Sequence, residues 1–356
     1  MSAMSVSRLA FRVAAAALLT ATAAVARAQP LAYTGVNLSG GEFGDVKPGV
    51  AAIHDKTFTY PNAGEFDYFA AKGVNIVRIP FHWEVLQPTL RQPLVGAEVD
   101  RLAEVVKTAT DKGLVVLLDP HNYARYYNQV VGTADVPDEA FADFWGRLAP
   151  VFKANPRVWM GLMNEPHDMP TDGWRDAANA AIAAIRKSGA KNLILVPGNG
   201  WTSAQGWAAN HNDTSLLEIR DPADHFIFEV HTYLDSDSSG TKIDVVSPTI
   251  GSERLHAFAL WCRLHHRHAL LGEFGAANTP QAGVAVDNML RSMEADRDVW
   301  TGFTYWSAGP WWGEYMFSVE PKTGPDGKKT DRPQLAFLQP HLQTRPIVGK
   351  PVSPVR

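Results

Sequence analysis

The sequence predicts an α/β fold, a (β/α)₈ TIM barrel formed by a single domain. Short runs rich in β-branched residues alternate with longer segments of helical period, which is typical of parallel strands joined by crossover helices. Eight such runs occur, the number that closes a barrel of this type. No low-complexity linker, repeat or block of charge divides the chain, so one domain accounts for its length.

Each expected strand is short and predominantly apolar. The strands are expected at 33–39, 74–81, 114–121, 158–165, 193–199, 226–233, 269–275 and 301–307. Helices are expected between them, among others at 65–73, 98–113, 138–155 and 173–189. Each of these helices ends near a glycine or asparagine that a new apolar run follows, as where a helix leads into the next strand. A doubly wound open sheet is the alternative, but "GVNLSGG" (35–41) lacks the G-x-G-x-x-G phosphate fingerprint, so nothing favours a dinucleotide-binding fold.

The first 28 residues have the pattern of a secretory signal peptide. Arg8 and Arg12 precede an apolar, alanine-rich stretch (13–26), and Ala26-Arg27-Ala28 is a small-x-small cleavage signature. The stretch is shorter than the ~20 residues of a membrane-spanning helix, which favours a cleaved signal over an anchor. We therefore expect a secreted or periplasmic protein whose single folded domain is 29–356.

Composition excludes some classes of protein. The net charge is −4 and no block of Lys and Arg stands out, which excludes nucleic acid as an expected partner. Cys262 is the only cysteine, so no intramolecular disulfide is possible and stability must come from the core.

Polar or aromatic residues stand at the ends of nearly all the expected strands. They are Arg78, His121, Asn164, Glu165, Asn199, Trp201, His231, Tyr233, Glu273 and Trp306. The carboxyl ends of barrel strands meet at one rim, where the active sites of such barrels lie. A lone histidine at a strand end is more often a hydrogen-bonded structural residue, but the coincidence across seven strands indicates a joint functional site.

Two members of this ring are acidic and have small or apolar neighbours, Glu165 and Glu273. Two carboxylates on opposite walls of a cleft suit the cleavage of a glycosidic bond, in which one protonates the leaving oxygen and the other attacks the sugar or activates water. Sugar rings stack on aromatic faces, and tryptophans lie in the loops that would frame such a cleft. These are Trp201, Trp306, Trp311 and Trp312.

An ordered set of motifs resembles family 5 glycoside hydrolases of the retaining clan A, and most closely the endo-β-1,4-glucanase (cellulase) branch. The motifs are "GVNLSGGEFGD", "VRIPFHWEVLQP", "DPHNYARYYNQVVG", "RVWMGLMNEPHDMPTDGW", "LVPGNGWTSAQGW", "VHTYLDSDSSGT", "LLGEFGAAN" and "GFTYWSAGPWWG". "NEP" alone recurs in many hydrolases of one barrel clan, whereas the ordered set covers essentially the whole chain after residue 28.

The resemblance implies a role for each rim residue. Glu165 would be the acid/base and Glu273 the nucleophile, with Arg78 orienting Glu273 and keeping it ionised. Asn164 would bind the sugar 2-hydroxyl, and Trp306 would form the floor of the subsite for the attacked sugar. Residues expected to surround the carboxylates or to bind sugar are His121, His231, Tyr233, Asn122 and Trp201.

The implied activity is endo-acting hydrolysis of cellulose-type and soluble β-glucans by double displacement with retention. It predicts carboxyl groups ~5 to 5.5 Å apart. No metal or organic cofactor enters this scheme. The expected partner is a β-1,4-linked glucan polysaccharide, with no nucleic acid, no membrane after signal cleavage, and a monomeric enzyme. Fungal members of the branch carry several cysteines and often a cellulose-binding module, and this sequence matches neither feature.

Several alternatives remain open at this stage. Mannan or xyloglucan could replace β-1,4-glucan, although "HTYLDSDSSGT" resembles the glucanase branch. A non-catalytic glycan-binding protein, or a metal-dependent hydrolase using His121 and His231, would use the same barrel. We expect "RLHHRH" (263–268) to be a solvated helix end rather than a metal site, and "DSDSSG" (235–240) to be a substrate-side loop rather than a calcium loop. We expect a structural hydrogen-bonding role for Asp119.

Overall fold

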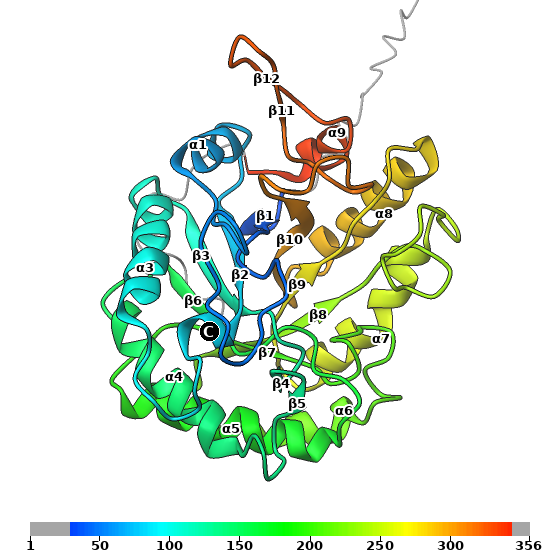
Figure 1. Ribbon diagram of the computed structural model, residues 1–356. Helices are drawn as coiled ribbons and strands as arrows, with labels where there is room; N and C mark the ends of the chain where they lie inside the picture. The colour runs from blue at the N-terminus through cyan, green and yellow to red at the C-terminus, as the bar shows by residue number, and fades with distance from the viewer. Residues whose placement is uncertain (1–28, 344–356) are drawn as a thin grey trace, which may run out of the picture.

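Eight parallel strands close into a barrel in the computed structural model, which describes residues 29–343. The strands follow the order β1-β10-β9-β8-β7-β6-β3-β2 around the barrel, and helices surround them (Figure 1). Their bounds are β1 (Tyr33–Leu38), β2 (Ile76–Phe81), β3 (Val115–Pro120), β6 (Val158–Gly161), β7 (Ile194–Pro197), β8 (Phe226–His231), β9 (Ala269–Glu273) and β10 (Trp300–Ala308). The predicted fold is therefore confirmed, and each predicted strand overlaps one of these.

The main helices cover the outside of the barrel. They are α1 (Ala63–Ala71), α3 (Gly96–Asp111), α4 (Asp138–Phe152), α5 (Thr171–Lys187), α7 (Ile250–Leu264) and α8 (Pro280–Ala295). The four helices that the sequence predicts correspond to α1, α3, α4 and α5. Short helices follow several strands, namely α2 (Trp83–Leu86), α6 (Asn212–Ser215), η1 (Leu216–Glu218), α9 (Leu335–Leu338) and η2 (Gln339–His341).

Two short hairpins project from the loops. One consists of β4 (Arg125–Tyr126) and β5 (Gln129–Val130), and the other of β11 (Lys322–Thr323) and β12 (Lys329–Thr330). The second hairpin stands out from the barrel near α9 (Figure 1). The predicted signal peptide, 1–28, lies outside the described residues. Within 29–343, none of the helices combines the length and apolar character needed to cross a membrane.

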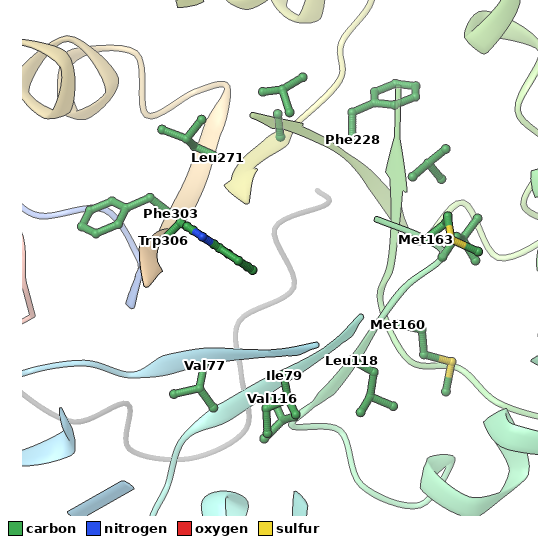
Figure 2. Close-up of a cluster of buried hydrophobic side chains, with 14 of the residues drawn as sticks. Val77, Ile79, Val116, Leu118, Met160, Met163, Phe228, Leu271, Phe303 and Trp306 are labelled. Carbon is green, nitrogen blue, oxygen red and sulfur yellow. The ribbon is translucent and has the colours of Figure 1, made fainter. Parts of the chain in front are cut away.

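Alternation along each strand creates two apolar layers, because both faces of a parallel barrel are covered. Val77, Val116 and Leu118 lie on the outer side of their strands, toward the helices (Figure 2). Residues between them point into the barrel and form a separate cluster, in which the rings of Tyr33 and Trp159 meet edge to face at 4.5 Å.

The inward-pointing residues change character along the barrel axis. On β3, Leu117 belongs to the inner apolar cluster and is followed on the same face by Asp119. On β8, Ile227 is followed on that face by Glu229 and His231. The apolar cluster thus fills the barrel at the amino-terminal ends of the strands. Buried charged side chains fill it at the carboxyl-terminal ends.

Candidate active site

Glu165 and Glu273 lie close together at the carboxyl rim. Glu273 is the last residue of β9, whereas Glu165 lies four residues beyond β6 in a left-handed backbone conformation (φ 40°). One carboxylate oxygen of each and a ring nitrogen of His231 all lie within 4.8 Å of one another. Two glutamates 108 positions apart in the chain are therefore brought face to face by closure of the barrel.

Two donors fix the carboxylate of Glu273. A guanidinium NH₂ group of Arg78 (Nη1) donates to its Oε1 at 2.9 Å, and the hydroxyl of Tyr233 donates to its Oε2 at 2.8 Å. The whole side chain is buried, so both contacts are formed away from bulk water. This carboxylate is held in one orientation.

Glu165 is held from one side only. Its Oε1 lies 2.8 Å from Nδ1 of His231, and the same nitrogen lies 3.7 Å from Oε2 of Glu273. The side chain of Glu165 is 15% exposed, against 5% for Glu273. Glu165 is thus the member of the pair that is open to a cleft, and the ring of His231 bridges the two.

Arg78 is the centre of a buried network of ions and amides. Its Nη1 lies 2.9 Å from Oδ2 of Asp119 and donates to Oδ1 of Asn37 at 3.0 Å. Its Nη2 donates to Oδ1 of Asn164 at 2.7 Å, and its Nε lies 2.9 Å from Oε1 of Glu229. The side-chain amide of Asn164 continues the network to Nε2 of His121 at 3.1 Å. Arg78 is fully buried, a position that a cation tolerates only with such compensation.

His121 and Asp119 form a pair next to this centre. Nδ1 of His121 lies 2.8 Å from Oδ2 of Asp119. Burial opposes ionisation of Asp119, but the charges of Arg78 and His121 outweigh it and lower its pKa. Burial likewise disfavours the charged form of His121, and Asp119 reverses this and raises the pKa of the imidazole. Asp119 contacts Arg78 and His121 rather than either glutamate, in keeping with the supporting role expected of it.

Burial and charge act in opposite directions on the central pair. Burial raises the pKa of Glu273, and the charge of Glu165 raises it further, whereas His231 and Arg78 oppose the rise. Arg78 and Tyr233 thus contact Glu273 as the sequence suggests, yet its pKa stays above the ordinary value. For His231, burial alone would lower the pKa. The charge of Glu273 and the hydrogen bonds with Glu165 and Glu229 raise that pKa to about 10.

A cleft of about 540 Å³ opens beside Glu165. Its walls come from the loops after β7 and β8, with Trp201 on one side and residues of 237–241 on the other. The ring of Trp201 is 49% exposed and stacks on His167 at 3.5 Å between ring centres. An exposed indole held flat by a second ring is a suitable surface for a sugar.

Trp306 forms another aromatic wall, on the β10 side of the barrel mouth. In Figure 2 its indole extends toward the barrel interior, unlike the neighbouring side chain of Phe303. It stacks on His121 with 5.3 Å between ring centres and meets Trp312 edge to face. The site thus has two aromatic surfaces, Trp201 in the cleft beside Glu165 and Trp306 beside His121.

Asn122 differs from the other predicted residues in where its side chain is engaged. Its Oδ1 accepts from the backbone N–H of Trp83, and its Nδ2 donates to Oε2 of Glu84 at 2.6 Å. These bonds secure the start of α2 and leave one N–H of Asn122 for other contacts. The structure therefore groups Arg78, His121, Asn164, His231, Tyr233 and Trp306 around the glutamates. Trp201 lies in the cleft, and the side chain of Asn122 contacts Trp83 and Glu84 instead of the glutamates.

The loop 235–240 lines the cleft, as predicted for a substrate-side loop. Asp235 is buried and accepts backbone N–H bonds from residues 240 to 242. The ammonium group of Lys242 lies 2.6 Å from Oδ2 of Asp237. A cationic side chain and backbone donors therefore occupy the oxygens that a calcium ion would need.

Among residues 29–343, one group of three side chains has the spacing of metal ligands: Glu165, His231 and Glu273. Both ring nitrogens of His231 face carboxylates, an arrangement that favours the doubly protonated ring and raises its pKa to about 10. A metal ligand must be a neutral imidazole with a free lone pair, so this group does not fit a metal ion. The residues 263–268 are outside this group, and His266 is exposed just beyond the end of α7.

Three residues of the network were not predicted as site residues: Asn37, Glu84 and Glu229. All three are buried. Glu229 stands two residues before His231, so strand alternation places it on the same inward face. That spacing is the signal in the sequence that could have identified it.

A closed (β/α)₈ barrel with two facing carboxylates and aromatic walls at its carboxyl rim has the features of a glycoside hydrolase. The model of the family described as cellulase (glycosyl hydrolase family 5) matches residues 35–309, and the chain belongs to this family.

Relatives and solved structures agree with this assignment. Endo-beta-1,4-glucanase A of Emericella nidulans is 40% identical over 295 residues, which cover 82% of this chain and 88% of that protein. An endo-beta-1,4-glucanase structure from Xanthomonas axonopodis pv. citri is 44% identical, with a TM-score of 0.82, covering 87% of this chain and 98% of that one. A structure of XacCel5A in complex with cellopentaose is also 44% identical, with a TM-score of 0.83, and covers 87% of this chain and 99% of that chain.

Proposed function

We propose that this glycoside hydrolase is an endo-acting β-1,4-glucanase that retains anomeric configuration, with Glu273 as nucleophile and Glu165 as acid/base. The observation that carries the proposal is the approach of the two carboxylates, whose nearest oxygens are within 4.8 Å. Retaining enzymes place their carboxyl groups about 5 to 5.5 Å apart, whereas inverting enzymes leave about 6.5 to 9.5 Å for a water molecule.

The assignment of roles follows from how each carboxylate is held. Glu273 is buried and fixed by Arg78 and Tyr233, which suits attack along one direction on the anomeric carbon. Glu165 is the more exposed and borders the cleft, which suits proton transfer to a leaving oxygen and later from an incoming water.

The electrostatics supports one proton shared by the pair. The charge of Glu165 is one cause of the raised pKa of Glu273. When Glu165 takes up a proton, that repulsion disappears and Glu273 ionises more readily. Glu273 would then form the glycosyl-enzyme while Glu165 protonates the departing oxygen, and the resulting Glu165 carboxylate would deprotonate water for the second displacement.

The substrate is proposed from the cleft and the relatives together. The relatives are named as endo-β-1,4-glucanases, and XacCel5A binds cellopentaose. The cleft beside Glu165 and the exposed face of Trp201 suit a chain of stacked sugar rings. Mannan and xyloglucan remain the rival substrates, because their discrimination depends on contacts with single hydroxyl groups or branches. Initial rates on carboxymethylcellulose, barley β-glucan, glucomannan, mannan and xyloglucan decide among them.

Two variants test the catalytic roles. We expect Glu273→Ala to abolish hydrolysis of every substrate, because this variant lacks the carboxylate that would form the glycosyl-enzyme. We expect Glu165→Ala to lose hydrolysis of polysaccharide but to keep slow glycosylation by 2,4-dinitrophenyl cellobioside, whose leaving group needs no proton. Azide should restore turnover of the latter variant by replacing the activated water. Glu253→Ala, an exposed glutamate on α7, is the matched control and should match the wild type.

The stereochemistry of the first-formed product tests the mechanism independently. The proposal requires that ¹H NMR first detects the β-anomer. Accumulation of the α-anomer, or equal loss of activity on the activated substrate in both glutamate variants without rescue by azide, would refute it.

Export of the enzyme also stays a proposal. The pattern of residues 1–28 supports a cleaved signal and a secreted or periplasmic catalytic domain. Amino-terminal sequencing of the protein recovered outside the cytoplasm tests the expected start at Gln29, and sedimentation tests the expected monomer.

A further inference from the structure

Glu229 is a buried carboxylate beneath the catalytic pair. It lies on β8, is 1% exposed, and points into the barrel between the outward-facing neighbours Phe228 and Val230. Its Oε1 lies 2.9 Å from Nε of Arg78 and 3.3 Å from Nε2 of His231. One oxygen therefore touches both of the cations that contact Glu273.

The neighbouring strands leave room for this side chain. A Cβ atom on Gly272 of β9 would lie 2.1 Å from Oε1 of Glu229, and one on Gly161 of β6 would lie 3.7 Å from its Oε2. Contact at 2.1 Å is not possible, so any side chain at position 272 would displace the carboxylate. Glycine at this position, directly before Glu273, fits a site built around Glu229.

Each ring nitrogen of His231 lies next to a carboxylate. Nδ1 faces Glu165 at 2.8 Å and Nε2 faces Glu229 at 3.3 Å. A ring with an acceptor at each nitrogen is most stable with both nitrogens protonated, that is, as a cation. The hydrogen bond with Glu229 is one of the causes that raise the pKa of His231 to about 10.

The charged groups around Glu229 and His231 come from several elements. Arg78 and Asp119 face them from β2 and β3, Glu165 from the loop after β6, Glu273 from β9, and His121 and Tyr233 from the loops after β3 and β8. Within this set Glu229 and Glu273 both contact Arg78 and His231, and Glu229 is the more deeply buried of the two, at 1% against 5% exposed.

The geometry assigns Glu229 as a positioning residue: it fixes the orientation and the positive charge of His231, and through His231 and Arg78 it fixes the surroundings of Glu273. This inference rests on the proposed function of the two glutamates. Glu229 does not touch substrate, so its effect is exerted through His231 and Arg78. A loss of its charge should therefore change kcat and the pH profile and leave KM nearly unchanged.

Glu229→Gln tests the assignment with little change of shape. The amide oxygen can still accept from Nε2 of His231 and lie beside Nε of Arg78, but the negative charge is lost. The imidazole of His231 is followed by ¹⁵N and ¹³C NMR of the resting enzyme between pH 5 and 10, with its signals assigned from His231→Asn. We expect the pKa of His231 to fall by about one unit or more and kcat to fall about tenfold, since one pKa unit corresponds to a tenfold change.

Glu294→Gln is the matched control. Glu294 is a buried glutamate whose Oε1 lies 2.9 Å from Nδ1 of the buried His341, outside the active site. This variant removes the same kind of pair, so it should affect stability but neither the titration of His231 nor the shape of the rate profile.

Two outcomes would overturn the inference: a His231 titration that is the same in Glu229→Gln and the wild type, or a loss of activity that resides in KM alone. If Glu229→Gln does not fold, Glu229→Asp carries the test, because the shorter carboxylate withdraws from Nε2 and should lower the pKa of His231 in part. The NMR readout uses the enzyme without substrate, so it stands apart from the variants of Glu165 and Glu273 that test the proposed function itself.

Discussion

The side chain of Glu65, in the first turn of α1, is buried, and its pKa is raised to about 7. Burial is the main cause, and the charge of the nearby Glu320 adds to it. The backbone N–H of Asn62 donates to Oε2 of Glu65 in a capping box, and Lys329 offsets part of the rise. The pKa of Glu320 is also raised by its burial, so the two carboxyl groups disfavour a doubly ionised state.

The expected effect on stability has a definite sign. A carboxyl group whose pKa is higher in the folded protein stabilises the fold below its unfolded-state value, near 4.5, and loses that contribution as the pH rises through about 7. The rise corresponds to about 3 kcal/mol, which is an upper value because loop movement would relieve part of it. Glu320 also accepts from the backbone N–H of Gly309, directly after β10. The loss of stability at high pH should therefore loosen the loop after β10, which contains Trp312.

Glu65→Gln removes this titration while its amide oxygen can keep the bonds of the capping box. We expect the variant and the wild type to unfold in urea with similar free energies at pH 4. At pH 8 the variant should be more stable by up to about 3 kcal/mol. Glu253→Gln, an exposed glutamate in the first turn of α7, is the control and should follow the wild type at both values. If the free energies of unfolding of Glu65→Gln and the wild type differed by the same amount at every pH from 4 to 8, the reasoning would be refuted.

Three further changes test the active site. Tyr233→Phe removes the hydroxyl that donates to Glu273 and so should raise the pKa of that carboxyl. The acidic limb of the profile of kcat/KM against pH should therefore shift to higher pH, and a limb at the wild-type pH would contradict this. Trp201→Ala removes an exposed stacking surface and should raise KM for cellopentaose about tenfold. The kcat for 2,4-dinitrophenyl cellobioside should stay unchanged. A loss confined to kcat would count against a binding role of Trp201. Dialysis against EDTA should leave the full initial rate, because both ring nitrogens of His231 are engaged by carboxylates; a loss that zinc or calcium restores would disprove it.

The sequence was sufficient to predict the barrel and to place Glu165 and Glu273 at one rim, because strand number and strand ends are repeated local signals. Eight apolar runs separated by helical segments fix the number of strands, and the polar residues at their ends mark one rim. Glu165 lies beyond the end of β6 and Glu273 lies at the end of β9, and closure of the barrel alone brings them together.

The supporting network was harder to predict because both faces of a barrel strand are buried. Alternation along β8 places Glu229 on the same face as His231, but it does not tell that the carboxylate meets Arg78 of β2 across the barrel. The direction of a loop side chain is equally undetermined, and Asn122 turns toward Trp83 and Glu84 instead of the glutamates. The pKa of Glu273 depends on the sum of burial and four charges, which a linear motif does not contain.

The balance of charge explains why so many ionisable groups can lie together in the barrel. Arg78 and His231 are cations, and each contacts a supporting carboxylate, Asp119 or Glu229. These two carboxylates compensate the two cations, so the surroundings of Glu165 and Glu273 are close to neutral. The oxygens of the two glutamates approach within 4.8 Å, and the charge of Glu165 is one cause of the raised pKa of Glu273, so a state with one acid and one carboxylate is favoured over double ionisation. A retaining glycosidase needs that state, one acid and one carboxylate, before the sugar arrives.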